Sequence, residues 1–275
     1  MGWIEAIVLG IIQGITEFLP ISSSAHLLVF SQVLGWDDPG AAFTAVTQIG
    51  TELAVIVYFR REIGSIIRAW ARSIVHADAR HDPDARMGWM VIIGTIPIAV
   101  LGLVFADQIE TIARNLWLTA SMLIIFAIIL FVADALGAKR KTERELTIRD
   151  GLIFGFAQAL ALIPGVSRSG ATISAGLAMG YQRAAAARYA FLLAVPAVLA
   201  SGLYEATKIG DDPQTSWGPT ILATVIAFGV GLAVIAWLMR WLTTRSYLPF
   251  VIYRIALGLL IVILLLTGSV QASGS

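Results

Sequence analysis

The stretch GIIQGITEFLPISSSAHLL (residues 10–28) decides how the rest of the chain is interpreted. It consists of two short apolar runs separated by a carboxylate, a proline, three consecutive serines and a histidine. In a continuous helix across a bilayer these polar groups would lie in hydrocarbon, whereas a broken helix that lines a polar cavity gives them partners. We therefore interpret residues 10–28 as one half of a polar site inside a membrane protein.

The composition of the 275-residue chain is that of a polytopic all-α membrane protein. Charged residues make up 13% of the chain and hydrophobic residues 58%, against roughly 25% charged residues in soluble domains. The chain has no cysteine, which excludes thiol nucleophiles, disulfides and thiolate metal sites. Its net charge of +1 gives no reason to expect a nucleic acid as a partner. Apolar stretches long enough to cross a bilayer predict six spans, at about 41–60, 88–106, 115–134, 184–206, 218–240 and 247–268.

Two further apolar segments are too short to span and are interrupted by Pro20 and Pro164, which predicts two re-entrant helical hairpins, at 3–34 and 151–180. The polar loops 61–87 and 136–150, counted with Arg60, hold eleven of the nineteen Lys and Arg residues, so both are expected on the cytoplasmic side. Two other connections are then expected outside: the turn that contains Asp107, Glu110 and Arg114, and the loop that contains Lys208. With this orientation the two hairpins enter the membrane from opposite faces.

The two hairpins also resemble each other in sequence. GIIQGITEFLPISSS (10–24) can be aligned with GFAQALALIPGVSRS (155–169) at an offset of 145 residues. Four identical residues then coincide: a glycine and a glutamine before the break (Gly10 with Gly155, Gln13 with Gln158), and two serines after it (Ser22 with Ser167, Ser24 with Ser169). We therefore expect a single integral membrane domain over residues 1–275 that contains an inverted-topology repeat. Repeat 1 covers about 1–135 and repeat 2 about 150–268, each with one hairpin and three spans.

In an inverted repeat the two hairpin tips meet near the middle of the membrane, which places their polar residues in one site. The second tip, PGVSRSGAT (164–172), is a Gly/Ser-rich turn that opens a helix. Its backbone N–H groups, its hydroxyls and the guanidinium of Arg168 all suit a phosphate. Glu17 lies on one helix face with Gln13 and needs a partner, either Arg168 or a divalent cation. His26 follows Ser23 by three residues, a spacing that allows a hydroxyl nucleophile to contact its general base.

Structural interpretations of the same residues stay open at this point. His26 could be hydrogen-bonded between helices, and at least one serine of 22–24 is expected to bond back to the preceding turn. Glu17 and Arg168 could form no more than a buried ion pair. Glu52, in the middle of the first span, either tunes the site or pairs across helices.

Three motifs resemble the signatures of the undecaprenyl-diphosphate phosphatase, or bacitracin-resistance, family. These signatures are an acid or Gln followed after three residues by Glu, then Ser-Ser-x-x-His, then PGxSRSxxT. The matching positions are Gln13 and Glu17, then Ser22, Ser23 and His26, and finally Ser167, Arg168 and Thr172. The likeness extends to about residue 268.

The resemblance implies an enzyme of the bacterial plasma (inner) membrane that hydrolyses undecaprenyl diphosphate to undecaprenyl phosphate and phosphate, and so recycles the lipid carrier of cell-wall synthesis. It also implies a site open to the outer face, a homodimer, and a Mg²⁺ or Ca²⁺ requirement with Glu17 as a ligand. A neutral Gln13 cannot give such a cation a second negative charge. The expected catalytic residues are Glu17, Ser23, His26 and Arg168, and the expected diphosphate-binding residues are Gln13, Ser22, Gly165, Ser167, Arg168, Ser169 and Thr172.

Three chemical routes and one rival function fit this sequence. Ser23, activated by His26, attacks the terminal phosphorus, or else His26 activates a water molecule or attacks itself. Alternatively, the inverted repeat with broken helices belongs to a transporter that flips the monophosphate lipid.

Overall fold

The computed structural model describes residues 1–106, 108–109, 115–207, 209 and 216–272. The turn residues Asp107, Glu110, Arg114 and Lys208, on which part of the orientation prediction rests, lie outside the described residues. Within the described residues, six helices are long and apolar enough to cross a membrane, which confirms the predicted spans. These helices are α3 (Gly40–Tyr58), α5 (Pro83–Val104), α7 (Leu116–Leu136), α10 (Arg183–Ala206), α11 (Trp217–Trp241) and α12 (Leu248–Leu266).

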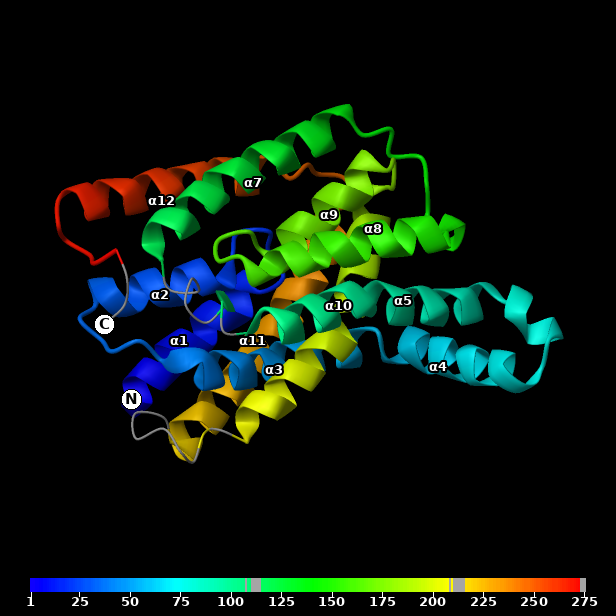
Figure 1. Ribbon diagram of the computed structural model, residues 1–275, viewed down its shortest axis with the longest axis horizontal. Coiled ribbons are helices and arrows are strands. Elements are labelled where there is room, and N and C mark those ends of the chain that lie inside the picture. The colour runs from blue at the N-terminus through cyan, green and yellow to red at the C-terminus, as the bar shows by residue number, and fades with distance from the viewer. Residues whose placement is uncertain (107, 110–114, 208, 210–215, 273–275) are drawn as a thin grey trace.

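The two segments interrupted by proline form two pairs of short helices. The first pair is α1 (Trp3–Thr16) and α2 (Ser23–Val33), and the second is α8 (Ile148–Ala159) and α9 (Arg168–Ala178), with a 3₁₀ turn η3 (Leu160–Leu162) after α8. The first residues of α8 and α9 lie 145 positions after those of α1 and α2, and α2 and α9 also end at this offset. Figure 1 shows α1 and α2 toward the end of the molecule where the N-terminus lies, and α8 and α9 extending from the opposite end. This arrangement supports the predicted inverted repeat.

Glycines without a Cβ let the short helices lie directly against long ones. A Cβ on Gly10 of α1 would come within 2.7 Å of the Ala223 carbonyl oxygen on α11. A Cβ on Gly155, at the equivalent position of α8, would come within 2.4 Å of the Gly94 carbonyl oxygen on α5. The two glycine contacts therefore dock α1 and α8 on α11 and α5, which hold the same place in the two halves.

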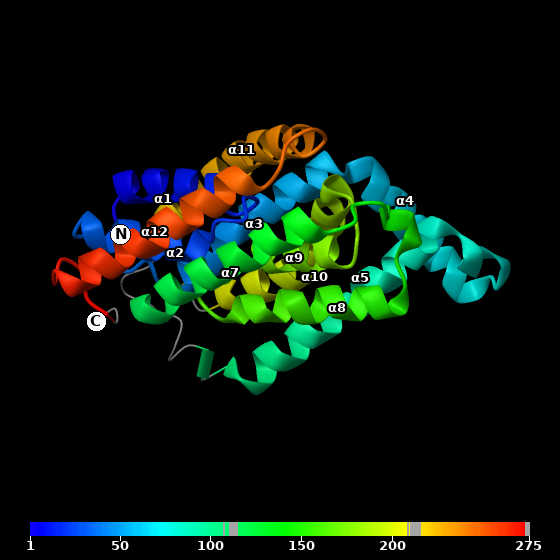
Figure 2. The same ribbon diagram turned by 90° about the horizontal axis from the view of Figure 1, so that it is seen from above.

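The basic loops 61–87 and 136–150 meet at one end of the molecule. The first contains α4 (Arg60–Val75) and η1 (Asp78–His81), and the second contains η2 (Glu143–Glu145). Arg188 of α10 joins them, because its Nη1 lies 2.7 Å from Glu143 Oε1 and its Nε 3.9 Å from Glu62 Oε2. Helix α4 lies antiparallel to the start of α5, and Trp70 of α4 packs edge-to-face against Trp89 of α5. The two helices project together along the long axis of the molecule (Figures 1 and 2). A shared end is what the predicted common cytoplasmic side requires.

The start of α8 is fixed at this same end by its capping residues. The Asp150 carboxylate accepts hydrogen bonds from the backbone and side chain of Thr147, and from the Tyr181 hydroxyl at 2.9 Å. Burial alone would raise the pKa of Asp150, but these hydrogen bonds to the charged form outweigh it and leave the pKa below its usual value. Asp150 is thus an ionised anchor for the second broken helix.

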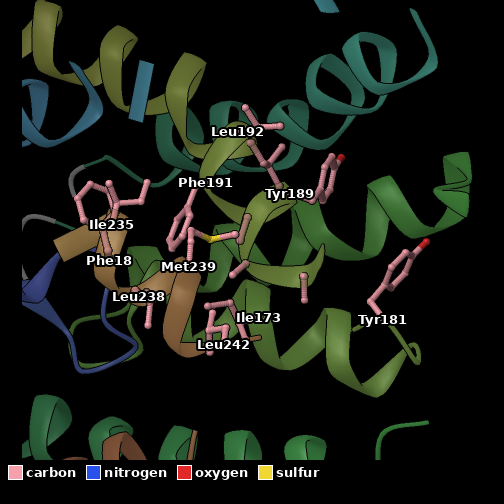
Figure 3. Close-up of a cluster of buried hydrophobic side chains, with 14 of the residues drawn as sticks. Phe18, Ile173, Tyr181, Tyr189, Phe191, Leu192, Ile235, Leu238, Met239 and Leu242 are labelled. Atoms are coloured by element: carbon pink, nitrogen blue, oxygen red, sulfur yellow. The ribbon is translucent and has the colours of Figure 1, made fainter. Parts of the chain in front are cut away.

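Two turns interrupt the broken helices: the first turn (residues 17–22) joins α1 to α2, and the second turn (residues 163–167) leads into α9. The main core lies beside both turns and fixes the first one. Phe18, the residue after Glu17, packs edge-to-face against Phe191 of α10 with ring centroids 5.4 Å apart. Figure 3 shows these two rings with Ile173 of α9 and Leu238 of α11, all of them buried. Because side chains from both halves interdigitate here, the position of the first turn is set by the second half of the chain.

Candidate functional site

The first turn is organised around the carboxylate of Glu17. Glu17 follows the last residue of α1, and its side chain is buried. Its Oε2 accepts hydrogen bonds from Gln13 Nε2 at 2.7 Å and from Ser23 Oγ at 2.8 Å. The predicted pairing of Gln13 with Glu17 on one helix face is therefore present, and the amide orients the carboxylate.

The second turn contributes Arg168, the first residue of α9. Its Nη2 atom donates to Glu17 Oε1 at 2.5 Å and to Glu52 Oε1 at 2.9 Å. Residues 17 and 168 thus meet as the two motifs predicted, and α3 adds a second carboxylate, which settles that Glu52 reaches the site. Glu52 Oε2 and Gln13 Oε1 are buried without a hydrogen-bond partner among the described residues.

Ser22 and Ser167 build the two turns in the same way. They have positive φ angles of 72° and 70°, rare for residues other than glycine, and each caps the helix that follows it. Ser22 Oγ lies 3.2 Å from Ser24 Oγ, and Ser167 Oγ lies 3.2 Å from Ser169 Oγ. The cap of Ser167 on the Gly170 N–H, at 3.2 Å, occupies its oxygen in this structure. Both serines therefore have a structural function in addition to any contact with a ligand.

Three other predicted diphosphate ligands are engaged with the protein itself. Thr172 Oγ1 donates to the Arg168 carbonyl at 2.7 Å, and Ser169 Oγ donates to the Leu19 carbonyl at 3.2 Å across the two turns. Gly165 has a φ of +86°, and a Cβ there would lie 2.3 Å from the Thr119 carbonyl oxygen. These residues shape the turns, while Ser23, Ser24, Ser167 and Arg168 are the partly or fully exposed polar side chains of the two tips.

His26 is close to Ser23 in the sequence but does not contact it in the way the spacing suggested. Its Nδ1 lies 2.7 Å from the Ser22 carbonyl oxygen, so Nδ1 carries the proton and donates. Its Nε2 lies 2.7 Å from the Tyr253 hydroxyl of α12, which therefore donates to it. The Ser23 hydroxyl is at the start of α2 and points to Glu17 instead. The predicted serine–histidine pair is thus replaced by a serine–glutamate pair and a tyrosine–histidine pair.

Arg254 is a site-supporting residue that the motif analysis did not find. It is fully buried, and its guanidinium donates to the carbonyls of Pro20, Gly165 and Val166 at 3.0, 2.9 and 2.9 Å. A further bond from its Nε to the Leu123 carbonyl, at 3.2 Å, ties both turns to α7. The available signal was that Arg254 is the single charged residue in the span 247–268, and such a residue needs partners inside the protein.

The site contains oxygen ligands suited to a hard cation such as Mg²⁺ or Ca²⁺, although only two carboxylates, those of Glu17 and Glu52, lie at Arg168. Among the described residues no group of three or more His, Asp or Glu side chains is arranged to hold a metal ion. The unpartnered Glu52 Oε2 and Gln13 Oε1 are the kind of oxygen ligands that Mg²⁺ and Ca²⁺ take, the remainder coming from water and substrate. The site therefore fits a cation held jointly by protein and substrate oxygens.

Comparisons with known proteins agree over nearly the whole chain. The sequence profile of the family described as "Bacitracin resistance protein BacA" matches residues 6–260. A Micrococcus luteus protein named undecaprenyl-diphosphatase is 59% identical, with 99% of this chain and all of that protein aligned. A Streptomyces coelicolor protein named undecaprenyl-diphosphatase 2 is 58% identical over 98% of this chain and 96% of its own length. A Frankia alni protein named undecaprenyl-diphosphatase 3 is 56% identical over 99% and 98%. This chain belongs to the BacA bacitracin resistance protein family.

Proposed function

We propose that the protein is a membrane-embedded phosphatase that hydrolyses undecaprenyl diphosphate to undecaprenyl phosphate and inorganic phosphate, recycling the lipid carrier for cell-wall polymers. The observation that carries the proposal is the ion pair of Arg168 with Glu17, which joins two helix-opening turns into one polar site. The names of the relatives, at 56–59% identity over 98–99% of this chain, support the substrate.

The second turn supplies the phosphate-binding groups. Arg168 uses its Nη2 atom on two carboxylates, which leaves the N–H groups of Nη1 and Nε for phosphate oxygens. The same residue opens α9, where the helix dipole favours an anion. A cluster of this kind stabilises the charge that builds up on a transferring phosphoryl group.

The first turn supplies the nucleophile. The Ser23 hydroxyl donates a hydrogen bond to Glu17 Oε2, so a lone pair of its oxygen is free to attack the terminal phosphorus in line, and its proton passes to Glu17 as the new bond forms. The bond from that phosphorus to the bridging oxygen breaks, and the lipid monophosphate leaves. This late proton transfer suits a loose transition state, which needs little proton removal before bond cleavage.

His26 is placed to serve the release of phosphate. Its neutral imidazole presents Nε2 as an acceptor, now occupied by the Tyr253 hydroxyl. When a water molecule takes the place of that hydroxyl, the same lone pair receives its proton as the phosphate is released from Ser23. Direct attack of such a water on the substrate is the alternative route. A bound Mg²⁺ or Ca²⁺, for which Glu17 and the Gln13 amide oxygen are candidate ligands, supplies charge neutralisation.

Phosphate release from undecaprenyl diphosphate by the purified wild-type protein in detergent, with and without EDTA, tests the function. We expect release that EDTA abolishes and that His26→Ala reduces at unchanged melting temperature. Absence of release by the wild type would reject the phosphatase. Phosphoserine at residue 23, found by mass spectrometry of acid-quenched turnover, would support the covalent route. Inversion of configuration at the transferred phosphorus, with no such adduct, would support direct water attack, because the covalent route has two displacements and gives net retention.

Lipid transport is a second candidate, because two broken helices that approach from opposite ends are an architecture of transporters. A flippase predicts movement of fluorescent undecaprenyl phosphate between leaflets of proteoliposomes, in the absence of diphosphate. Phosphate release without such movement would favour the enzyme alone.

The plasma membrane location with the site open to its outer face, and the homodimer that the family implies, complete the proposal. The shared end of the two basic loops supports the orientation, since positively charged loops stay in the cytoplasm. The dimer is tested by the mass of the protein–detergent complex in light scattering.

A further inference from the structure

Glu52 reaches the site from outside both hairpins. It lies on α3 and is 1% exposed, and its Oε1 accepts from Arg168 Nη2 at 2.9 Å. Helix α3 packs closely against α11 near Glu52, because a Cβ on Gly50 would come within 2.2 Å of the Thr224 carbonyl oxygen. This close approach of α3 to α11, one half-turn from Glu52, fixes the height at which the carboxylate meets Arg168.

The charges at this point do not balance without a ligand. Arg168 Nη2 has two hydrogens, and one goes to Glu17 and one to Glu52, so two carboxylates share one guanidinium. Arg254, the other buried cation at the turns, donates to backbone carbonyls. Within the part of the chain that the structure describes, Glu52 Oε2 has no hydrogen-bond partner, and a buried carboxylate oxygen without a partner is costly. The arrangement is thus complete only when a positive group joins it.

The neutral Gln13 explains why a second acid is needed elsewhere. Its amide donates to Glu17 at 2.7 Å, which a carboxylate at this position could not do. The chain therefore has one carboxylate on the first turn where the family pattern also accepts two. Glu52, on α3, supplies the second carboxylate from a different helix.

We propose that Glu52 is the second carboxylate of the diphosphate site: it shares Arg168 with Glu17 before substrate binds, and with Glu17 it binds a hard divalent cation. The inference rests on the proposed phosphatase function and deepens it. When the diphosphate draws Arg168 to its own oxygens, Glu52 loses that cation as a partner, and a divalent ion compensates the exposed charge. Gln13 and Glu52 are then a complementary pair, in which the charge can be moved from one position to the other.

A charge-swap experiment tests this assignment. Glu52→Gln is expected to lower phosphate release by about 10-fold or more and to raise the Mg²⁺ concentration for half-activation, as loss of a group that supports a metal does. The double variant Gln13→Glu, Glu52→Gln is expected to recover most of the phosphate release and to bring the Mg²⁺ concentration for half-activation back toward the wild-type value. Glu62→Gln removes a half-buried carboxylate paired with Arg188 at 3.9 Å, far from the turns, and serves as the matched control with wild-type behaviour.

A second readout does not depend on turnover. Mn²⁺ bound to the purified protein without substrate, measured by electron paramagnetic resonance, is expected to weaken by about 10-fold in Glu52→Gln and to return in the double variant. Wild-type activity, Mg²⁺ dependence and Mn²⁺ binding in Glu52→Gln would overturn the proposal. So would a lower melting temperature and lost activity that Gln13→Glu does not restore, because that result assigns Glu52 a purely structural role. If the wild type releases no phosphate, the phosphatase fails, while the Mn²⁺ comparison still decides on Glu52.

Discussion

Arg254 shows how one side chain can organise a site that it does not enter. Its guanidinium binds backbone carbonyls of both turns, and none of the ion pairs among the described residues includes it. Carbonyl oxygens concentrate at the turns because the broken helices leave them without intrahelical partners. A cation that satisfies several of them therefore stabilises a backbone that has no regular structure.

Replacing Arg254 is expected to separate the two turns. Arg254→Met leaves buried carbonyls unpaired, at roughly 1–3 kcal/mol for each group, so we expect a melting temperature lower by about 5 °C or more and loss of phosphate release. Arg254→Lys keeps the charge and is expected to fall in between. The exposed Arg240, changed to Met, is the control. A wild-type melting curve and activity in Arg254→Met would contradict the supporting role.

Arg168 has a different task in the proposed mechanism, in which its planar guanidinium binds two carboxylates and a phosphate. Arg168→Lys keeps the charge but offers a single compact ammonium. We expect phosphate release to fall by roughly 100-fold, the cost of losing a donor aimed at developing charge, with little change in melting temperature. Arg188→Lys, at the end where the two basic loops meet, should stay close to wild type. Near-normal activity of Arg168→Lys would argue against a bidentate grip on the phosphate.

The serine–histidine pair shows the limit of helical spacing as a guide to contacts. Residues three apart share a helix face only inside the helix, whereas Ser23 is the first helical residue and its side chain points out of the helix start toward Glu17. The partner of His26, Tyr253, is 227 positions away and carries no local signal in the sequence.

At the scale of elements, the sequence contained most of the fold. Apolar length located the six spans, and the two prolines located the breaks, since both properties are local. The helix α5 begins at Pro83, five residues before the predicted span, because Asp82 caps it with a side-chain bond to the Asp84 N–H at 2.9 Å. The cap lies in a polar segment, where hydropathy gives no signal.

The second turn is expected to tolerate no side chain at Gly165. Gly165→Ala combines a positive φ with a Cβ 2.3 Å from the Thr119 carbonyl oxygen, so α7 or the turn must move. Gly180 has a similar φ of +89°, but its Cβ would meet only the Ala138 Cβ, at 3.6 Å. Gly180→Ala thus isolates the backbone cost of about 1 kcal/mol.

We expect Gly165→Ala to lose phosphate release and to melt below Gly180→Ala, which should keep its activity. Thermal melting in detergent and the phosphate assay on both variants measure this difference. Equal effects of the two substitutions would mean that the close contact with α7 is unimportant.

At the scale of the whole molecule, the two ends should lie on opposite sides of the membrane. Ala71 on α4 and Ser269 after α12 are both exposed. Figure 1 shows α4 and the segment that follows α12 toward opposite ends of the long axis. The natural chain has no cysteine, so one introduced cysteine reports one position. A membrane-impermeant maleimide on intact cells is expected to label Ser269→Cys and to leave Ala71→Cys unlabelled until the cells are opened. The reverse pattern would invert the predicted orientation.

The parts of the site that could not be predicted are those that join the halves. The offset of 145 residues predicted that the tips of the two hairpins meet, and it could do so because a repeat carries its own symmetry. The contact of Glu52 with Arg168 depends on how α3 is rotated against α9, and Arg254 depends on how α12 crosses both turns. Those rotations are set by the packing of side chains from the whole chain, and a single short motif carries no information about that packing.

The tie made by Arg254 also bears on how independent the two halves can be. Their outlines match, yet the side chain that holds both turns belongs to the second half of the chain alone, and it reaches Pro20 in the first half. A polypeptide cut between the halves would leave the N-terminal piece with an unanchored bend, while the C-terminal piece would keep its own. The two halves are therefore matched in outline but unequal, since Arg254 of the second half holds the bend of the first, beside the contacts of Phe18 with Phe191 and Glu17 with Arg168.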